Sequence, residues 1–283
     1  MKAIRFLSLI VLTGLGVLAV GCGRGRPVGN LSVRPTSVTL AHPLVATLSF
    51  RWTPIALLDG LEGTPRVFVH VLDGARRLLR TFDHPLPEAW TPGREQTYEI
   101  ELFQSAIAER LPAGTYEITF GLYDDAGKTR WPLVVEGEEV GRREYRLATL
   151  VVPSVPVPSP TFQFSGAWLP VEPGSSKQVV ARRCLRTEGA ISVSSPPSPG
   201  AVRVAASVAT SGPASTSAAW RVSASCTSET LEVTKPQLEW IGFPMVPTAA
   251  GPACEIRFTP PALPSTELRT LCLEALAWRP AAR

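Results

Sequence analysis

Proline is spread through this chain more densely than in most proteins, and it limits the possible folds more than any other residue. The 283 residues include 28 prolines, about twice the usual share of roughly 5%. A proline inside a helix costs about 3 kcal/mol, so long helices are disfavoured. Several stretches between the prolines alternate apolar and polar residues, as half-buried strands do. The sequence therefore predicts an all-β chain, long enough for two domains.

The N-terminal residues have the pattern of an export signal. Lys2 and Arg5 precede an uncharged stretch, Phe6 to Val20, which as a helix would span about 22 Å, less than the ~30 Å core of a bilayer. It therefore predicts a cleaved signal peptide over residues 1–21 rather than a membrane span. The motif Leu18-Ala19-Val20-Gly21-Cys22 resembles the lipobox of bacterial lipoproteins. The alternative is an ordinary secretory signal with an incidental cysteine.

The lipobox resemblance implies a lipid anchor on Cys22, with palmitate among its acyl chains, and so a membrane as partner. Two or three acyl chains anchor a protein stably. We expect a protein of the bacterial cell envelope, and Gly23 after the cysteine implies the outer membrane, on its periplasmic side, in a Gram-negative cell. Residues 22–30 are rich in glycine and are expected to be a tether.

In the first folded region, residues 31–152, apolar and polar residues alternate in short segments that are separated by turn residues. Tyr116 follows a Leu-Pro-Ala-Gly-Thr run and resembles the tyrosine corner of immunoglobulin-like sandwiches. The pair Asp73-Gly74 predicts a hairpin, and a single helical turn is expected at Ser105 to Glu109. The predicted strands are Leu44 to Trp52, Arg66 to Leu72, Leu78 to Phe82, Thr97 to Leu102, Thr115 to Tyr123 and Glu144 to Val152.

Several motifs of this region, taken in order, resemble a sandwich module that accompanies bacterial membrane glycosyltransferases and other envelope-polysaccharide proteins. They are Phe68-Val69-His70-Val71-Leu72-Asp73-Gly74, Asp83-His84-Pro85, Trp90-Thr91-Pro92-Gly93, Leu111-Pro112-Ala113-Gly114-Thr115-Tyr116 and Gly121-Leu122-Tyr123-Asp124. The resemblance implies an immunoglobulin-like β-sandwich.

Residues 153–161 are rich in proline and predict an extended linker, after which residues 162–283 form a second domain. Phe164 to Glu172, Arg182 to Arg186 and Glu267 to Leu276 resemble the ends of a jelly-roll, carbohydrate-module-like domain of the same proteins. Strands are predicted at Lys177 to Arg186, Ala190 to Ser194, Ala201 to Val208, Ala218 to Ser225, Thr230 to Thr234, Glu255 to Thr259 and Leu268 to Trp278. The Ser/Ala-rich run Ser207 to Ala219 is expected to be a loop.

Four cysteines remain besides Cys22, all in the second domain. An exported chain meets an oxidising compartment, so two disulfides are expected. Three pairings are open, and we favour Cys184 with Cys272 and Cys226 with Cys254, because the first and last strands of jelly-roll sandwiches are often neighbours.

Motifs for catalysis, metals or cofactors are not found in the sequence. It has no G-x-S-x-G elbow, H-E-x-x-H helix or phosphate-binding loop, and a hydrolase would need two opposed carboxyls that a sequence cannot reveal. His70 and His84 are predicted to lie about 17 Å apart, too far to share a metal, and to hydrogen-bond the backbone instead. The net charge of +4 is dispersed, which argues against nucleic acid.

Two non-catalytic roles therefore remain. A saccharide-binding module would stack sugars on exposed aromatic rings, and Trp90 and Trp131 are the candidates because each lies beside proline, outside the alternating pattern. Trp52, Trp220 and Trp278 fit core positions. One alternative is a scaffold that binds another protein in an envelope assembly or export complex. The other is a hydrolase, which would require a solvent-open pocket holding two opposed carboxylates.

Overall fold

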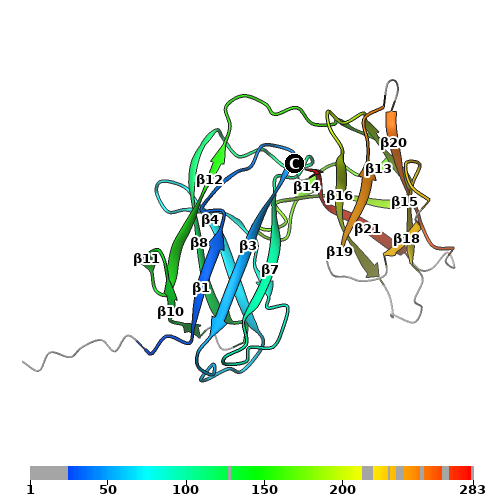
Figure 1. Cartoon of the computed structure of the whole chain (residues 1–283). Coiled ribbons are helices and arrows are strands. Elements are labelled where there is room, and N and C mark those ends of the chain that lie inside the picture. The colour runs from blue at the N-terminus through cyan, green and yellow to red at the C-terminus, as the bar shows by residue number, and fades with distance from the viewer. Residues whose placement is uncertain are drawn as a thin grey trace, which may run out of the picture.

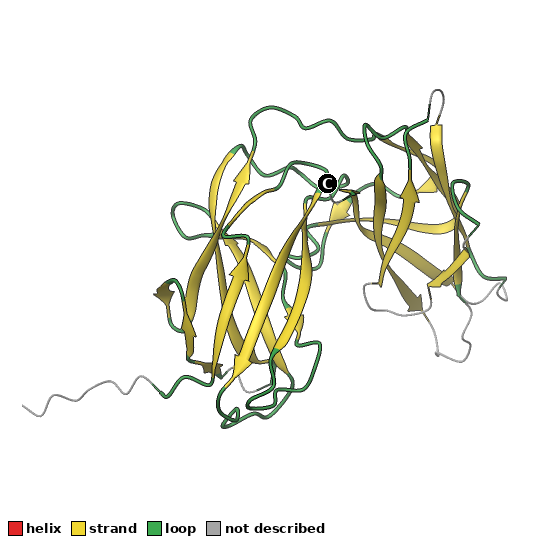
Figure 2. Cartoon of the chain, in the orientation of Figure 1, coloured by secondary structure: helices red, strands yellow, loops and turns green. Residues whose placement is uncertain are grey.

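The computed structural model describes residues 25–126, 129–211, 219–228, 230–233, 239–248, 252–262 and 268–281. Within these ranges the regular structure is β-strand, with no helix, and Figure 2 shows strands and loops throughout. None of the described residues forms a helix that could cross a membrane. The expected signal peptide and Cys22 lie outside the described residues.

The first domain consists of two sheets that face each other, with strand orders β10-β1-β3-β7 and β11-β12-β8-β4-β5. The short strands β2, β6 and β9 also belong to the second sheet and pair with β12, β4 and β8 respectively. The strands are β1 (Gly29–Arg34), β2 (Ser37–Thr39), β3 (Val45–Pro54), β4 (Pro65–Leu72), β5 (Leu78–Thr81), β6 (His84–Pro85), β7 (Gln96–Phe103), β8 (Gly114–Asp124), β9 (Arg130–Trp131), β10 (Leu133–Val135), β11 (Glu138–Gly141) and β12 (Glu144–Val152).

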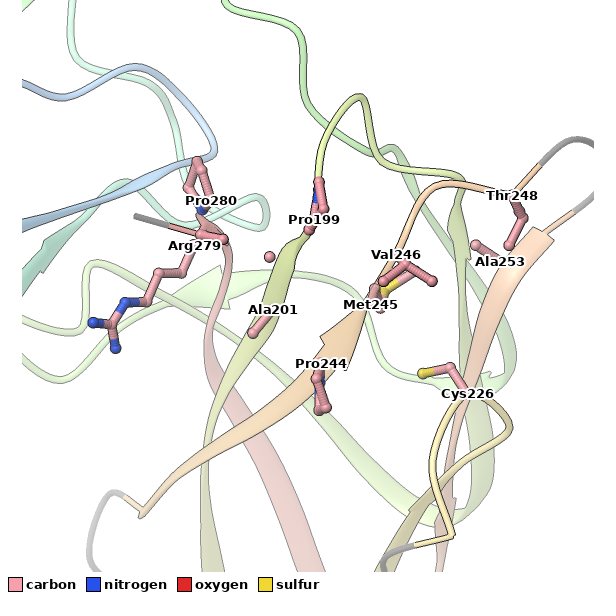
Figure 3. A pocket seen from close by; sticks show the side chains of 12 residues that line it. Pro199, Ala201, Cys226, Pro244, Met245, Val246, Thr248, Ala253, Arg279 and Pro280 are labelled. Carbon is pink, nitrogen blue, oxygen red and sulfur yellow. The ribbon is translucent and has the colours of Figure 1, made fainter. Parts of the chain in front are cut away.

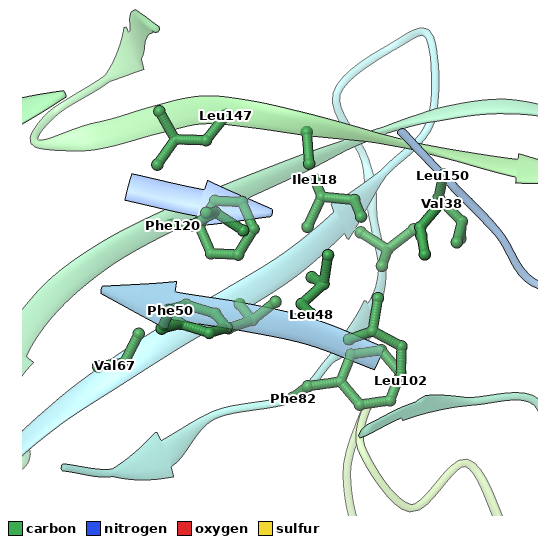
Figure 4. Close-up of a cluster of buried hydrophobic side chains, with 14 of the residues drawn as sticks. Val38, Leu48, Phe50, Val67, Phe82, Leu102, Ile118, Phe120, Leu147 and Leu150 are labelled. Atoms are coloured by element: carbon green, nitrogen blue, oxygen red, sulfur yellow. The ribbon is translucent and has the colours of Figure 1, made fainter. Parts of the chain in front are cut away.

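Alternate side chains of the two sheets fill the space between them. Leu48 and Phe50 on β3 face Ile118 and Phe120 on β8 (Figure 4), and all four are fully buried. The predicted strands of this domain are confirmed to within a few residues. The tyrosine corner is also confirmed, because the Tyr116 hydroxyl donates a 2.7 Å hydrogen bond to the carbonyl of Pro112.

Two expectations for this domain were wrong. A helical turn was expected at Ser105 to Glu109, but these residues form no helix. They contain one isolated turn, in which the Ala108 amide donates to the Ser105 carbonyl. The expected tether is also shorter than predicted, because Val28 is buried and Gly29 begins β1. Strand β1 lies inside the sheet, paired with both β3 and β10, so the apolar residues that follow the glycine-rich run are part of the fold.

The second domain is a jelly-roll-like sandwich built from one sheet that passes through two layers. Its order is β18-β17-β20-β15-β21-β16-β19, with β13 and β14 also paired to β15. The strands are β13 (Phe162–Trp168), β14 (Glu172–Pro173), β15 (Ala181–Ser194), β16 (Gly200–Ser211), β17 (Trp220–Ala224), β18 (Thr230–Val233), β19 (Glu239–Met245), β20 (Pro252–Thr259) and β21 (Leu268–Pro280).

Strand β15 links the two layers because it changes partner along its length. Its first part, Arg183 to Leu185, pairs with β21, and its second part, Gly189 to Ser194, pairs with β20. The two strands predicted here, Lys177 to Arg186 and Ala190 to Ser194, are therefore a single strand. Side chains from both layers, including the three fully buried rings of Trp220, Trp278 and Phe243, share one core.

The structure joins Cys184 to Cys272 and Cys226 to Cys254, the pairs that we favoured. Cys184 and Cys272 occupy opposite positions on β15 and β21. The second bridge ties the turn after β17 to β20, the strand beside it. Both bridges therefore join neighbouring parts of the same sheet.

The two sandwiches lie side by side and are docked against each other, with residues 153–161 passing between them without a strand (Figure 1). Small side chains form the contact on the second domain: Ala205, Ala275 and Ala277 are fully buried among core residues of the first. Backbone hydrogen bonds cross the junction, from the Trp278 amide to Pro43 (2.8 Å) and from the Ala106 amide to Leu276 (2.7 Å). Alanines allow this close backbone approach because they add little beyond Cβ.

Candidate functional site: the cleft between the two sandwiches

The structure does not present Trp90 and Trp131 as open platforms. Trp131 is only 3% exposed, and its indole N–H donates to the carbonyl of Asp59 at 3.0 Å. Trp90 is half-buried, packs edge-to-face against Trp52 at 5.8 Å and donates to the carbonyl of Ala56 at 2.9 Å. Both indoles therefore hold the loop that follows β3. A proline next to a tryptophan in the sequence therefore does not indicate whether the indole ring is exposed, because a loop distant in sequence can cover it.

The remaining tryptophans divide into core and half-buried positions. Trp52, Trp220 and Trp278 are fully buried, as predicted. Trp168 and Trp240 are half-buried. The Trp168 ring packs edge-to-face against Phe164 on β13 and Phe258 on β20. Trp240 lies where the two domains meet, which makes it the indole of interest.

A cleft of about 420 Å³ opens between the two sandwiches. The first domain lines it with residues of β7, among them Glu99 and Glu101, and the second lines it with Arg203, Trp240 and Arg279. The sheet pattern explains the placement, because side chains two residues apart on β7 project from the same face. Charged groups and one indole from four strands thus converge on one hollow.

Glu101 is the electrostatic centre of the cleft. Its carboxylate accepts from the Arg203 Nε at 3.0 Å and from an Arg279 terminal nitrogen at 2.8 Å. Arg203 on β16 lies opposite Ala277, and Arg279 follows two positions later on β21, so both guanidinium groups face the first domain. The side chain of Glu101 is 16% exposed and that of Arg203 is 23% exposed, so this ion pair is partly shielded from water.

Trp240 supplies the aromatic surface of the cleft. Its ring meets the edge of Phe103 at 4.8 Å and lies 5.6 Å from the Arg203 guanidinium carbon. Arg203 therefore contacts both a carboxylate and an indole, which fixes its orientation. Gly242 lies opposite Arg203 on the neighbouring strand, and a Cβ there would lie 2.8 Å from an Arg203 nitrogen. The glycine leaves room for the guanidinium.

His84 lies at the first-domain side of the cleft. Its Nδ1 is 3.0 Å from the Phe82 carbonyl and its Nε2 is 2.9 Å from the Tyr98 hydroxyl. Burial lowers the pKa of this imidazole, so the neutral ring holds the Tyr98 hydroxyl in place. The predicted backbone hydrogen bond is found for His84.

His70 was expected to hydrogen-bond the backbone in the same way, and this was wrong. Its Nδ1 lies 3.4 Å from a Glu144 carboxylate oxygen, and its Nε2 lies 3.9 Å from Asp83. The contact with His70 is the main reason that the pKa of Glu144 falls to about 2, while burial raises the pKa of Asp83. In the part of the chain that the structure describes, no group of three or more His, Cys, Asp or Glu side chains could hold a metal.

Comparisons with known proteins do not identify a family. No protein-family model and no curated protein matches the sequence. Similar solved structures include a carbohydrate-binding module of the β-sandwich superfamily, with 12% identity over 90% of this chain and 99% of that one, at a TM-score of 0.22. A Bacteroides uniformis β-glucuronidase has 10% identity over 90% of this chain and 30% of its own, at a TM-score of 0.26. The Cry4Aa toxin of Bacillus thuringiensis has 11% identity over 92% of this chain and 54% of its own, at 0.22. At such TM-scores the fold assignment rests on the strands described above.

The carboxylates of the cleft are not arranged as a glycosidase pair. Glu99 and Glu101 project side by side from one strand, whereas the two catalytic carboxyls of a glycosidase flank the scissile bond. Glu101 is also held by two guanidinium groups.

A second hollow, of about 790 Å³, lies on the second domain near the ends of β16, β19 and β21. Its lining is mainly apolar and includes Pro244, Met245, Val246 and Ala253, with no aromatic ring (Figure 3). The Arg279 side chain extends away from the other lining residues in this view. An apolar hollow without aromatic rings is a poor site for a sugar and a better one for an apolar protein segment.

The sequence did not single out the residues of the cleft. Glu101 and Arg203 are separated by 102 residues, so no local motif joins them. The one signal in the sequence is the pair Glu99 and Glu101, two charges on the same face of a predicted strand.

Proposed function

We propose that this protein is a lipid-anchored lipoprotein of the bacterial cell envelope that binds a saccharide, without catalysis, in the cleft between its two sandwiches. The observation that supports this role is the lining of the cleft, where Glu99, Glu101, Arg203 and Arg279 lie beside the Trp240 indole. Carboxylate and guanidinium groups hydrogen-bond sugar hydroxyls, and an indole packs against the apolar face of a sugar ring.

The size and charge of the cleft restrict the class of ligand that it could bind. Its volume of about 420 Å³ falls within the usual range of roughly 300–1,000 Å³ for small-ligand sites. The two carboxylates and two guanidinium groups balance in charge. A short, uncharged segment of envelope glycan fits these properties better than a strongly anionic polymer.

The proposed lipid anchor would hold the binding site at a membrane. The lipobox-like motif that ends at Cys22 supports lipidation there, and two disulfides agree with an oxidising compartment. In a Gram-negative cell, Gly23 after the cysteine supports sorting to the periplasmic side of the outer membrane. Intact-mass analysis of protein extracted from native membranes tests this part: the mass of a diacylated Cys22 supports it, and an unprocessed leader contradicts it.

A glycan-binding screen tests the saccharide. The chain should begin at Gly25, because Val28 is part of the core. Binding that weakens at least tenfold in Trp240→Ala and in Glu99→Ala supports the cleft. Trp168→Ala is the matched control, since it removes a half-buried indole outside the cleft. Binding unaffected by the two cleft substitutions would place the sugar elsewhere.

The apolar hollow favours a second candidate function, which is docking of a partner protein in an envelope assembly or export complex. Val246 at its rim is 64% exposed and is continuous with the apolar lining of the hollow, and contiguous apolar surface of this kind marks protein contact sites. If no glycan binds and an envelope protein co-purifies with the wild type but not with Val246→Asp, the scaffold role replaces the saccharide role.

A further inference from the structure

We propose that the loop between β3 and β4 lies on the surface of the phospholipid bilayer and inserts Ile55, Leu57 and Leu61 among the headgroups. This inference rests on the anchor in the proposed function, because a lipid on Cys22 would bring this end of the molecule to the membrane. It adds a second membrane contact, made by the folded domain itself.

The three side chains are exposed to an unusual degree. Ile55 is 51% exposed, Leu57 is 68% exposed and Leu61 is 42% exposed. They lie within seven positions of each other, and Val134, 49% exposed, lies on β10 at a position paired with Asn30 near the same end. Neighbouring exposed apolar residues mark a contact surface, and aliphatic side chains at a membrane interface are stabilised by leaving water.

Hydrogen bonds fix the loop in this shape, so its apolar side chains are held outward. The Asp59 carbonyl accepts from the Trp131 indole at 3.0 Å, and the amides of Glu62 and Gly63 donate to the Asp124 carboxylate at 2.7 and 2.9 Å. Leu58 points the other way and packs against the core. One aliphatic side chain of the loop therefore packs inward and anchors it to the core. The other three point outward, and no described part of the protein covers them.

The loop begins beside the N-terminal segment. The amides of Ile55 and Ala56 both donate to the carbonyl of Val28, at 2.8 and 3.0 Å. Val28 is only six positions after Cys22, and at 3.3–3.6 Å per position this distance is at most about 20 Å at full extension. A lipid on Cys22 therefore keeps the loop within about 20 Å of the bilayer. Figure 1 shows the N-terminal segment leaving the sandwich at the end where β3 finishes.

The charges around the loop decide which membrane it fits. Asp59 and Glu62 are exposed at this end, and two exposed cations lie near the loop: Arg26, which precedes β1, and Arg51 on β3, which is paired with Glu95. Anionic lipids would repel the two carboxylates. We therefore expect contact through apolar insertion into a zwitterionic surface, with little dependence on salt.

A fluorescence experiment tests this contact without depending on natural lipidation. Residues 1–24 are replaced by a hexahistidine tag, and the protein is held on phosphatidylcholine vesicles that contain a nickel-chelating lipid. Both cores consist of residues from Val28 onward, so this chain keeps every described core contact. Leu57→Cys is labelled with an environment-sensitive dye, since the other four cysteines are in disulfides.

The matched control is the same dye at Val171→Cys, because Val171 is 50% exposed on the second domain. We expect a blue shift and a several-fold rise in emission for the dye at position 57, quenched by spin-labelled lipid, and neither change at 171. Ile55→Ser with Leu61→Ser should lower the untethered protein's vesicle affinity about tenfold. Equal responses at 57 and 171 would overturn the proposal.

The outcome is separate from that of the anchor. Flotation of the full chain from native membranes reports whether Cys22 carries lipid, while the tethered vesicles report whether the loop enters the bilayer. A loop that enters the bilayer in a protein without lipid would support the inference and contradict the proposed anchor. A lipidated protein whose loop stays in water would support the proposed anchor and contradict the inference.

Discussion

Replacing Glu101 by glutamine removes the charge that joins the two domains while keeping the size of the side chain. The carboxylate bonds Arg203 at 3.0 Å, where both side chains are largely buried, and Arg279 at 2.8 Å, where the guanidinium is 46% exposed. A hydrogen bond to a charged group contributes about 1.5–3 kcal/mol, and an exposed pair about 0.2–1 kcal/mol. We expect Glu101→Gln to lower the free energy of unfolding by about 2 kcal/mol.

Urea unfolding combined with two double-mutant cycles measures how this loss is divided. The cycle of Glu101→Gln with Arg203→Gln should give a coupling energy of about 1.5 kcal/mol, and the cycle with Arg279→Gln about 0.5 kcal/mol. Glu95→Gln is the control, because Glu95 bonds Arg51 at 2.8 Å within one domain and both side chains are well exposed. If Glu101→Gln is no more destabilising than Glu95→Gln, or if the two couplings are equal, the reasoning from burial is wrong.

Three further predictions concern the stability of the single domains. The pKa of Glu144 falls from 4.5 to about 2, chiefly through its bond to His70. Its carboxylate therefore stabilises the fold above pH 4.5, and up to about 3 kcal/mol of this stabilisation is lost as the pH falls towards 2. Glu144→Gln should flatten this part of the stability curve in urea titrations between pH 2 and 7. Tyr116→Phe should cost about 1 kcal/mol by thermal unfolding, because one partly buried hydrogen bond is lost. Replacing Cys184 and Cys272 together by alanine opens a loop of 88 residues and should cost about 4 kcal/mol; an unchanged urea midpoint would contradict the pairing.

Local patterns in the sequence were sufficient to locate many of the strands. Alternation of apolar and polar residues marked β3, β7 and β8, and the Tyr116 corner followed from a run of five residues. These features depend on neighbours in sequence. The all-β class followed from the same alternation and from the density of proline.

Features that depend on distant packing escaped prediction. Two strands are predicted, one ending at Arg186 and the next beginning at Ala190, yet β15 runs through Gly189 between them, where a Cβ would lie 2.9 Å from the Trp168 indole nitrogen. The glycine is needed for close approach rather than for a turn. Trp131 was judged by its neighbouring proline, although the loop at Asp59 covers it. The cleft joins Glu101 to arginines more than 100 residues away, which no local pattern encodes.

The docking of β21 against the first sandwich has a consequence for biogenesis. Ala275 and Ala277 belong to the last strand of the second domain, yet they are buried with the core of the first. In the exported lipoprotein that we propose, the N-terminus crosses the membrane first, so Leu44 and Ala106 of the first sandwich would stay uncovered until almost the whole polypeptide has crossed. Periplasmic chaperones would bind the protein in that interval, and a premature stop codon shortly before β21 would leave both halves prone to aggregation.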